Sequence, residues 1–207
     1  MSNYKELAMD LLPHLEKRNF EAYYCENKED AANLAISFID KNDVIAFGGS
    51  RTVLEVGIPD KLREDGYNLI ERGRSFSPEE NERRMRQGLI SDTFLMGTNA
   101  ITKDGILVNI DGTGNRVAAM CYGPKQVIIV VGMNKLCDTL EDAVYRVQNV
   151  ASPLNAKRFG LTKTGCSKGK CVDCLSDECM CSYIVQTRRC KPKGKIKIIL
   201  VGEDLGF

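Results

Sequence analysis

The densest group of reactive side chains in this sequence is a run of cysteines near its carboxyl end. Six of the nine cysteines lie between Cys166 and Cys190. Thiolates spaced by two and four residues can surround one metal centre, and Cys-x4-Cys-x2-Cys followed by a more distant cysteine is a spacing used by iron–sulfur proteins. We therefore expect an iron–sulfur cluster here, with the predicted ligands Cys166, Cys171, Cys174 and Cys181.

Alternatives for this cysteine block remain open. A tetrahedral zinc site made of four cysteines usually contains two Cys-x2-Cys pairs, whereas this block has one such pair, Cys171 and Cys174. Cys179 competes with Cys181 for the fourth ligand position. Free thiols or disulfides are a weaker third interpretation, because a chain of 207 residues is unlike the small secreted domains that disulfides hold together.

A second group suited to binding is the loop Gly48-Gly49-Ser50-Arg51, which follows the apolar run 43–47. If a helix starts after this loop, its free backbone N–H groups, the serine hydroxyl and the guanidinium suit a phosphate or a carboxylate. The alternative is a tight turn in which glycine only supplies a positive φ. The loop matches neither a Walker A motif nor a dinucleotide-binding fingerprint.

The most polar stretch, residues 97–118, joins two predicted strand ends to a helix. Asp111 is a candidate general base or hydroxyl acceptor, and Arg116 is a candidate anion clamp. A third loop, after the run 126–132, adds an amide and an ammonium group. The predicted catalytic residues are Asp111, Asn115 and Arg116, and the predicted ligand-binding residues are Gly48, Gly49, Ser50, Arg51, Asn99, Gly112, Thr113, Gly114, Asn134 and Lys135.

The elements that must position these residues alternate between helix and strand. Pro13 is expected to close the first helix early, and Asp138 to cap the last one. Several strands are continuous Val and Ile runs, as a sheet covered on both faces requires. The fold class is therefore α/β, with a mainly parallel sheet, helices on both faces and ligand sites at the carboxyl ends of its strands. Helices are predicted over residues 4–17, 28–39, 51–58, 78–89, 113–122 and 139–150, and strands over 43–47, 67–71, 94–96, 106–110, 126–131 and 195–201.

Composition and charge argue against nucleic-acid binding and membrane insertion. The chain has 29 basic and 28 acidic residues, so no overall field attracts nucleic acid. No apolar run approaches the roughly 20 residues that cross a bilayer, and residues 1–18 carry charges where a signal peptide needs an apolar core. We therefore expect a cytoplasmic protein without membrane insertion. Residues 161–207 hold nine basic and five acidic side chains, which favours one domain over 1–207 carrying a basic, cysteine-rich insert at 161–193.

Four runs together carry a family resemblance: NAITKDGILVNIDGTGNRVAAM (99–120), YGPKQVIIVVGMNK (122–135), NVASPLNAKR (149–158) and ILVGEDLGF (199–207). They resemble the LUD-domain family of lactate-utilisation proteins, formerly a domain of unknown function. The resemblance implies the isomerase and CoA-transferase-like α/β fold of ribose-phosphate isomerases and glucosamine-phosphate deaminases. Asn99 stands where the methylthioribose-phosphate isomerase branch has a catalytic aspartate, which argues against sugar-phosphate isomerisation.

The function predicted from the residues and the resemblance is lactate or related organic-acid utilisation, with an anion-binding pocket and a cysteine-ligated metal centre. With an iron–sulfur cluster, the chain would be an electron-transfer subunit with a redox or lactate-utilisation partner protein. The alternatives are a non-redox transferase, isomerase or ligase acting on a phosphorylated or carboxylated metabolite, and a metabolite-sensing regulatory subunit. The expected ligand is a small anionic metabolite, and homo-oligomer formation is left open.

Overall fold

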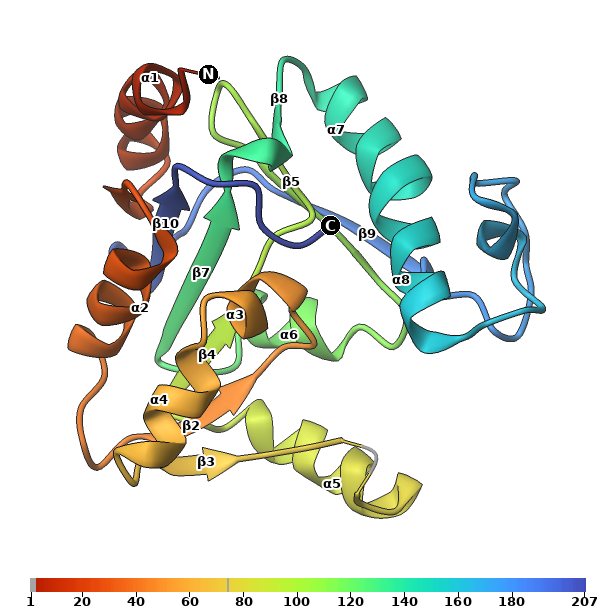
Figure 1. Cartoon of the computed structure of the whole chain (residues 1–207), viewed down its shortest axis with the longest axis horizontal. Coiled ribbons are helices and arrows are strands. Elements are labelled where there is room, and N and C mark those ends of the chain that lie inside the picture. Colours follow the sequence, from red (N-terminus) through yellow and green to blue (C-terminus); the bar gives the residue numbers. More distant parts are fainter. Residues whose placement is uncertain (1–2, 74) are drawn as a thin grey trace.

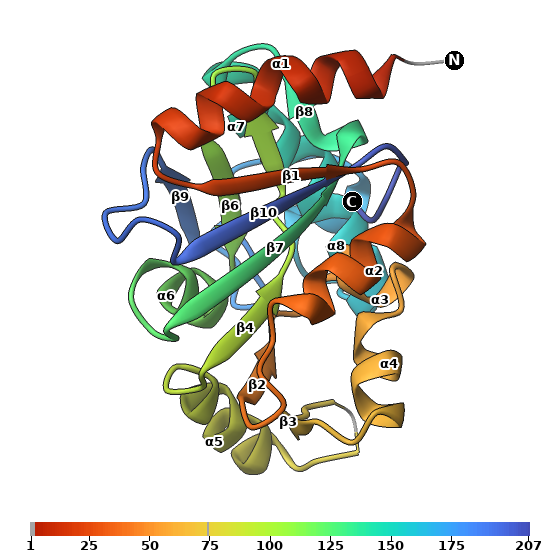
Figure 2. The same cartoon turned by 90° about the vertical axis from the view of Figure 1, so that its left-hand side faces the viewer.

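The computed structural model describes residues 3–73 and 75–207 and contains two β-sheets (Figure 1). The larger sheet has six strands, and every neighbouring pair is parallel. The predicted α/β class with a mainly parallel sheet is confirmed, and Figure 2 shows the strands fanning from β1 to β3. In spatial order the strands are β1 (Glu21–Cys25), β10 (Ile196–Val201), β7 (Gln126–Gly132), β4 (Thr93–Met96), β2 (Val44–Phe47) and β3 (Asn68–Ile70).

Both faces of this sheet are buried, as the continuous Val and Ile runs predicted. On β7, Ile129 belongs to the apolar cluster on one face and Ile128 to the cluster on the other. The Ile128 cluster includes buried residues of α2 (Lys28–Ser37), α3 (Arg51–Glu55) and α4 (Ile58–Glu64). The Ile129 cluster includes residues of α1 (Tyr4–Lys17) and α6 (Asn115–Cys121), while α5 (Pro78–Gly88) lies beside β2 and β3.

A second sheet, which the sequence patterns did not predict, has the order β8-β5-β6-β9. β5 and β6 form an antiparallel hairpin, and Gly105 between them has a φ of +88°. β9 lies inside the cysteine-rich region 161–193 and pairs with β6. The strands are β8 (Leu136–Cys137), β5 (Ala100–Thr102), β6 (Leu107–Asp111) and β9 (Tyr183–Thr187).

The helical segment after β8 is longer than predicted. α7 (Leu140–Arg146) continues through a π-helical turn, η2 (Val147–Ala151), into α8 (Ser152–Phe159). The N-cap of α7 is Thr139, which forms a capping box with Asp142, so the cap lies one position after the predicted Asp138. The helix was predicted to end at residue 150. It continues because Ala151 and Ala156 are fully buried, so their packing stabilises the next turns.

Two prolines lie within helices instead of ending them. Pro13 lies inside α1 instead of closing it, because the neighbours Leu11 and Leu15 are buried in the core and their packing outweighs the lost backbone hydrogen bond. Pro59 does not stop a helix. It lies in the first turn of α4, where a missing N–H has no partner to lose, and Gly57 separates α4 from α3.

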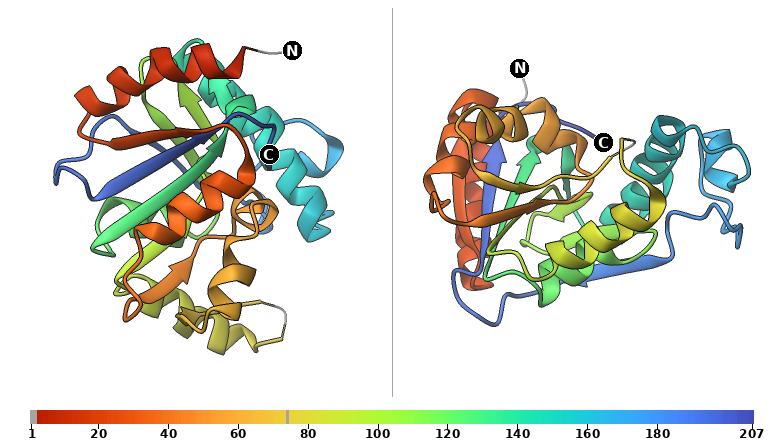
Figure 3. Two further views of the ribbon diagram at one scale, coloured as in Figure 1. Left: turned by 60° about the vertical axis from the view of Figure 1, so that its left-hand side comes forward. Right: turned by 90° about the horizontal axis from the view of Figure 1, so that it is seen from below.

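The cysteine-rich segment extends from the end of α8 and lies outside the two sheets until it enters β9 (Figures 1 and 3). A single 3-10 turn, η3 (Gly165–Lys168), is its regular structure before β9 among the described residues. Within residues 3–73 and 75–207, none of the helices has the length and apolar character needed to span a membrane.

Candidate functional site

A pocket of about 310 Å3 opens where β2, β4, β7 and β10 end. The chain continues from these strands through Gly48–Arg51, Gly97–Asn99, Met133–Lys135 and the C-terminal residues. Ten of the thirteen predicted catalytic and ligand-binding residues line it, namely Gly49, Ser50, Arg51, Asn99, Asp111, Gly112, Thr113, Asn115, Arg116 and Lys135. The carboxyl-end geometry of a parallel sheet thus brings together residues that lie far apart in sequence.

Three predicted ligand-binding residues, Gly48, Gly114 and Asn134, shape the surroundings of the pocket without lining it. A Cβ at Gly48 would lie 3.0 Å from Cδ of Arg116. Gly114 is the left-handed N-cap of α6 and packs on the Tyr183 ring. The side-chain oxygen of Asn134 accepts a hydrogen bond from the backbone N–H of Leu205 and so fastens the C-terminal segment.

Arg116 is held by protein oxygens on both terminal nitrogens of its guanidinium. Nη1 donates to the Gly97 carbonyl at 3.0 Å and to Asn109 Oδ1 at 2.6 Å, and Nη2 donates at 2.8 Å to both Asn99 Oδ1 and the Ile110 carbonyl. Nε faces Asp111 Oδ2 at 3.9 Å. An arginine has five N–H groups, so four of them are satisfied and the fifth points towards a carboxylate.

Asp111 ends β6 and caps the helix that follows. Its Oδ2 accepts from the backbone N–H groups of Arg116 at 3.2 Å and Val117 at 3.1 Å. Asp111 side-chain exposure is 13%, and Oδ1 has no hydrogen-bond partner among the residues that the structure describes. One carboxylate oxygen therefore remains for a ligand at the pocket wall.

Two other polar side chains of the same turn bind each other. Thr113 Oγ1 donates to Asn115 Oδ1 at 2.8 Å, and both residues line the pocket. Asn115 keeps its side-chain N–H2 group without a protein acceptor among the described residues, so it can donate to a ligand.

The pocket is rich in cations. Arg72, which the sequence patterns missed, makes no side-chain hydrogen bond within the described part of the chain, and burial lowers its pKa while Asp111 raises it. Arg158 donates through Nη2 to the Gly49 carbonyl at 3.1 Å. Arg158 Nε is buried without a hydrogen-bond partner among the described residues, and burial lowers the pKa of Arg158, with Arg51 acting in the same direction. An arrangement of this kind favours an anion, because several partly desolvated cations attract negative charge strongly.

Lys135 is the most deeply buried cationic residue of the pocket, with 3% of its surface exposed. Nζ donates to Thr52 Oγ1 at 2.7 Å. Burial, followed by the charges of Arg146 and Arg116, lowers the pKa of Lys135 to about 7, while Glu55 acts in the opposite direction. At neutral pH the amine therefore exists in both protonation states.

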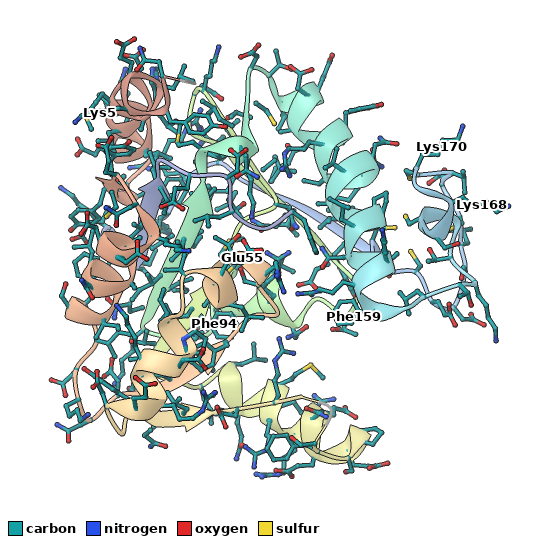
Figure 4. The ribbon with its side chains drawn as sticks, in the orientation of Figure 1. Lys5, Glu55, Phe94, Phe159, Lys168 and Lys170 are labelled. Atoms are coloured by element: carbon teal, nitrogen blue, oxygen red, sulfur yellow. The ribbon has the colours of Figure 1, made fainter. Side chains whose placement is uncertain are left out.

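Several lining residues had no signal in the sequence, because folding brings them in from other elements. α8 contributes a partly exposed aromatic ring, Phe159, and the chain terminus contributes Phe207; the Arg158 guanidinium lies 4.4 Å and 5.9 Å from the two ring centres. Figure 4 shows Phe159 at the end of α8. The unpredicted lining residues are Thr52, Arg72, Gly97, Thr98, Ile110, Ser152, Asn155, Arg158, Phe159, Met180 and Phe207.

The cysteine-rich segment touches the pocket. Met180 lines it, and a Cβ at Gly112 would lie 3.2 Å from the Met180 Cα. In contrast, Lys168 and Lys170 lie at the far end of the segment (Figure 4).

The thiols of this segment gather but do not form a ligand shell. Sγ of Cys179 and Sγ of Cys181 are 3.1 Å apart. The pKa of the Cys166 thiol is raised by burial and by Cys171, Cys174 and Cys179, and burial followed by Cys179 raises the pKa of Cys181 to about 12. The soft, all-sulfur donor set suits an iron–sulfur cluster or zinc. Across the described residues, however, no three His, Cys, Asp or Glu side chains are arranged to hold a metal.

Comparisons with known proteins give one family match and several distant structures. The model of the LUD domain matches residues 9–201. A DUF162 family protein from Deinococcus radiodurans is 12% identical with a TM-score of 0.48, over 98% of this chain and 100% of that chain. The eIF2B beta subunit from Chaetomium thermophilum is 16% identical with a TM-score of 0.41, over 56% of this chain and 44% of that chain.

A third similar structure is ribose 5-phosphate isomerase A from Neisseria gonorrhoeae, which is 16% identical with a TM-score of 0.36, over 55% of this chain and 54% of that chain. No curated protein matches the chain.

Proposed function

The chain belongs to the LUD domain family, as its motifs predicted, and from that premise we propose that it binds a small organic anion of lactate-type metabolism in the pocket at the carboxyl end of the sheet. The family supports a general role in lactate utilisation. The identity of the anion and the chemistry performed on it are inferred from the pocket rather than from the family.

One observation carries the proposal: Arg72 lies in the pocket without an acceptor among the described residues, and Arg158 lies beside it with a buried Nε that has no partner among those residues. The two guanidinium groups lie close together. A Cβ added to Gly49 would be 3.7 Å from Nη2 of Arg72 and 3.9 Å from Nη2 of Arg158. Two guanidinium groups that converge on one glycine form a bidentate site for a carboxylate or phosphate.

The residues predicted to be catalytic take separate roles in this proposal. Arg116 holds Asn99, Asn109 and the loop carbonyls in place, so it positions the site rather than binding the anion. Asp111 offers Oδ1 to a hydroxyl group of the ligand. Asn115 presents its N–H2 group next to it, so a hydroxy acid would meet an acceptor and a donor on the same wall.

The binding test is calorimetric titration of the full chain with L-lactate, pyruvate and inorganic phosphate at low ionic strength. We expect at least one of these anions to bind, and Arg72→Met and Arg158→Met each to weaken that binding by about tenfold or more, the effect of losing one charged hydrogen bond. Arg86→Met is the matched control, because Arg86 is exposed on α5 and pairs with Glu82. Absence of binding by all three anions, or equal losses in Arg86→Met, would contradict the proposal.

We further propose that Cys166, Cys171, Cys174 and Cys181 hold an iron–sulfur cluster, with zinc as the alternative and Cys179 as the competing fourth ligand. A bound cluster supplies one-electron transfer, whereas zinc would only stabilise the segment. What supports this proposal is the thiol donor set and its gathering within one segment next to Met180. A redox partner protein of lactate utilisation is the partner that it implies, while homo-oligomer formation and a cytoplasmic location stay predictions.

Anaerobic purification followed by iron, sulfide and zinc analysis tests the metal proposal. We expect metal in the parent chain, and its loss in Cys174→Ser. Cys121→Ser is the control, because Cys121 is an exposed free thiol outside the segment. A parent protein without iron, sulfide and zinc refutes this part of the proposal but leaves anion binding intact.

A further inference from the structure

Lys135 Nζ makes one hydrogen bond to the described residues, whereas an ammonium group has three N–H donors. Its Nζ donates to Thr52 Oγ1, and that hydroxyl donates its own hydrogen to the Leu205 carbonyl at 3.3 Å. No other acceptor for Nζ is present among the described residues, although the residue is 97% buried and lines the pocket. The remaining hydrogens of Nζ therefore have no acceptor among these residues, and a neutral amine at this position has a free lone pair at the wall of the pocket.

The charged groups around Lys135 favour this neutral amine. Arg116 and Arg146 are the nearby cations and Glu55 is the nearby acid. The Glu55 carboxylate is already engaged by Arg51 Nε at 2.8 Å and by the backbone N–H of Gly206 at 2.6 Å. Burial and these cations lower the pKa of Lys135 to about 7, so a large fraction is unprotonated at physiological pH.

The C-terminal segment keeps Nζ in place. Gly206 has a φ of +62°, and a Cβ there would lie 3.3 Å from Nζ of Lys135 and 2.9 Å from the backbone N of Thr52. Figure 4 shows Glu55 on α3 near this segment. The amine is therefore held between Thr52 of α3 and the C-terminal segment, which limits its rotamers and preorganises it for reaction.

No other strong nucleophile lines the pocket in the described part of the chain. The Ser50 hydroxyl caps α3 by accepting from the Val53 N–H. The Ser152 hydroxyl donates to the Val147 carbonyl at 2.9 Å. There is no cysteine or histidine among the lining residues, and arginine stays protonated.

We propose that Lys135 is a nucleophile that forms an imine with the carbonyl group of a small anion held by Arg72 and Arg158. This inference rests on the proposed function, because those cations must bind the anionic end. The neutral amine attacks the carbonyl carbon to form a C–N bond. The carbonyl oxygen, with two protons from the nitrogen, leaves as water, and the imine is neither oxidised nor reduced relative to the reactants.

Two sources share this ligand chemistry: 2-oxo acids, whose anion is a carboxylate, and phosphorylated aldehydes, whose anion is a phosphate. The experiment therefore has two arms, pyruvate and D-glyceraldehyde 3-phosphate, each incubated with the full chain and sodium borohydride. Borohydride supplies hydride to convert the imine into a stable secondary amine. Intact mass and peptide mapping then locate the adduct.

We expect one adduct per chain, on Lys135, with one of the two probes. Its formation rises between pH 6 and 8 and then levels off, whereas adducts on surface lysines keep increasing towards their ordinary pKa of about 10.4. Lys135→Arg, which keeps the charge, loses the adduct, and Lys157→Arg, on the exposed side of α8, keeps it. Because the mapping uses the unmodified chain, the inference stays testable even if Lys135→Arg folds poorly.

A parallel titration with oxalate and inorganic phosphate, which cannot form an imine, separates this inference from the proposed function. If either anion binds and neither probe labels Lys135, the imine proposal is overturned and the anion site stands. If neither anion binds and Lys135 is not labelled, both fail. Labelling spread evenly over surface lysines also overturns the imine proposal.

Discussion

Replacing Arg116 by methionine should test whether this residue positions the site or binds the ligand. The side chain donates four hydrogen bonds to protein oxygens, all between 2.6 and 3.0 Å, and 12% of it is exposed. Methionine fills much of the same volume but donates none of these bonds. Two side-chain amide oxygens and two backbone carbonyls would lose this donor in a region that water reaches poorly, although Asn99 Oδ1 keeps the backbone N–H of Ile110 at 3.1 Å.

The expected loss of stability follows from these contacts. A buried acceptor without a partner costs about 1–3 kcal/mol, and some of the four oxygens can turn to other donors or to water. The nearby Asp111 also loses one of its two neighbouring cations, Arg116, and keeps Arg72. We therefore expect a loss of about 3–5 kcal/mol in the free energy of unfolding, as for a broken buried ion pair. For a chain of this size that corresponds to a decrease in Tm on the order of 10 °C.

Urea unfolding followed by circular dichroism measures this change, and Arg72→Met is its matched control. Arg72 lines the same pocket without a protein hydrogen bond among the described residues. Its removal relieves repulsion of Arg116, so the free energy of unfolding should stay within about 0.5 kcal/mol of the parent or rise. Anion binding should fall in Arg72→Met.

The reasoning would be refuted by the opposite pattern. If Arg116→Met unfolds within about 1 kcal/mol of the parent while anion binding disappears, Arg116 is a ligand-binding residue with weak structural contacts. If Arg72→Met is instead the strongly destabilised variant, the assignment of free and engaged guanidinium groups is wrong.

Three further results are expected. Asp111→Ala removes the acceptor that caps α6 and should lower the free energy of unfolding by about 1 kcal/mol, whereas Asp111→Asn keeps an acceptor oxygen and should lose less in the same urea titration. Lys135 has its pKa lowered from 10.5 to about 7, so between these pH values the unfolded chain binds a proton that the folded chain does not. The stability of the parent relative to Lys135→Met should therefore rise with pH across this interval, and a flat difference in urea midpoints would contradict it. Gly206→Ala would place a methyl group 2.9 Å from the Thr52 backbone N at a positive φ; we expect a loss of about 1–3 kcal/mol in thermal unfolding, and no loss would show that the C-terminal segment is loosely held.

Much of the α/β framework could be predicted because burial leaves a direct mark on sequence. The run QVIIVVG (126–132) is apolar at every position from Val127 to Val131, and the structure places these residues in clusters on both faces of β7. The helix starts at Asn27 and Ser77 were also predictable, since each cap is a local hydrogen bond between a side chain and the third residue after it. The second sheet was not predicted, because β5 and β8 are only three and two residues long and their pairing depends on contacts far apart in sequence.

The pocket was likewise predictable only in part. The sequence by itself determined which loops meet, because parallel strands bring their carboxyl ends to one edge, and it determined that these loops carry Asp111, Asn115, Arg116 and Lys135. Only the tertiary structure decided what each group does. Arg116 is engaged and Arg72 is free, although both are arginines, because the carbonyl and amide oxygens around Arg116 come from residues 97–110 and none reaches Arg72. The availability of a charged side chain depends on acceptors that folding places around it, and local sequence holds no record of them.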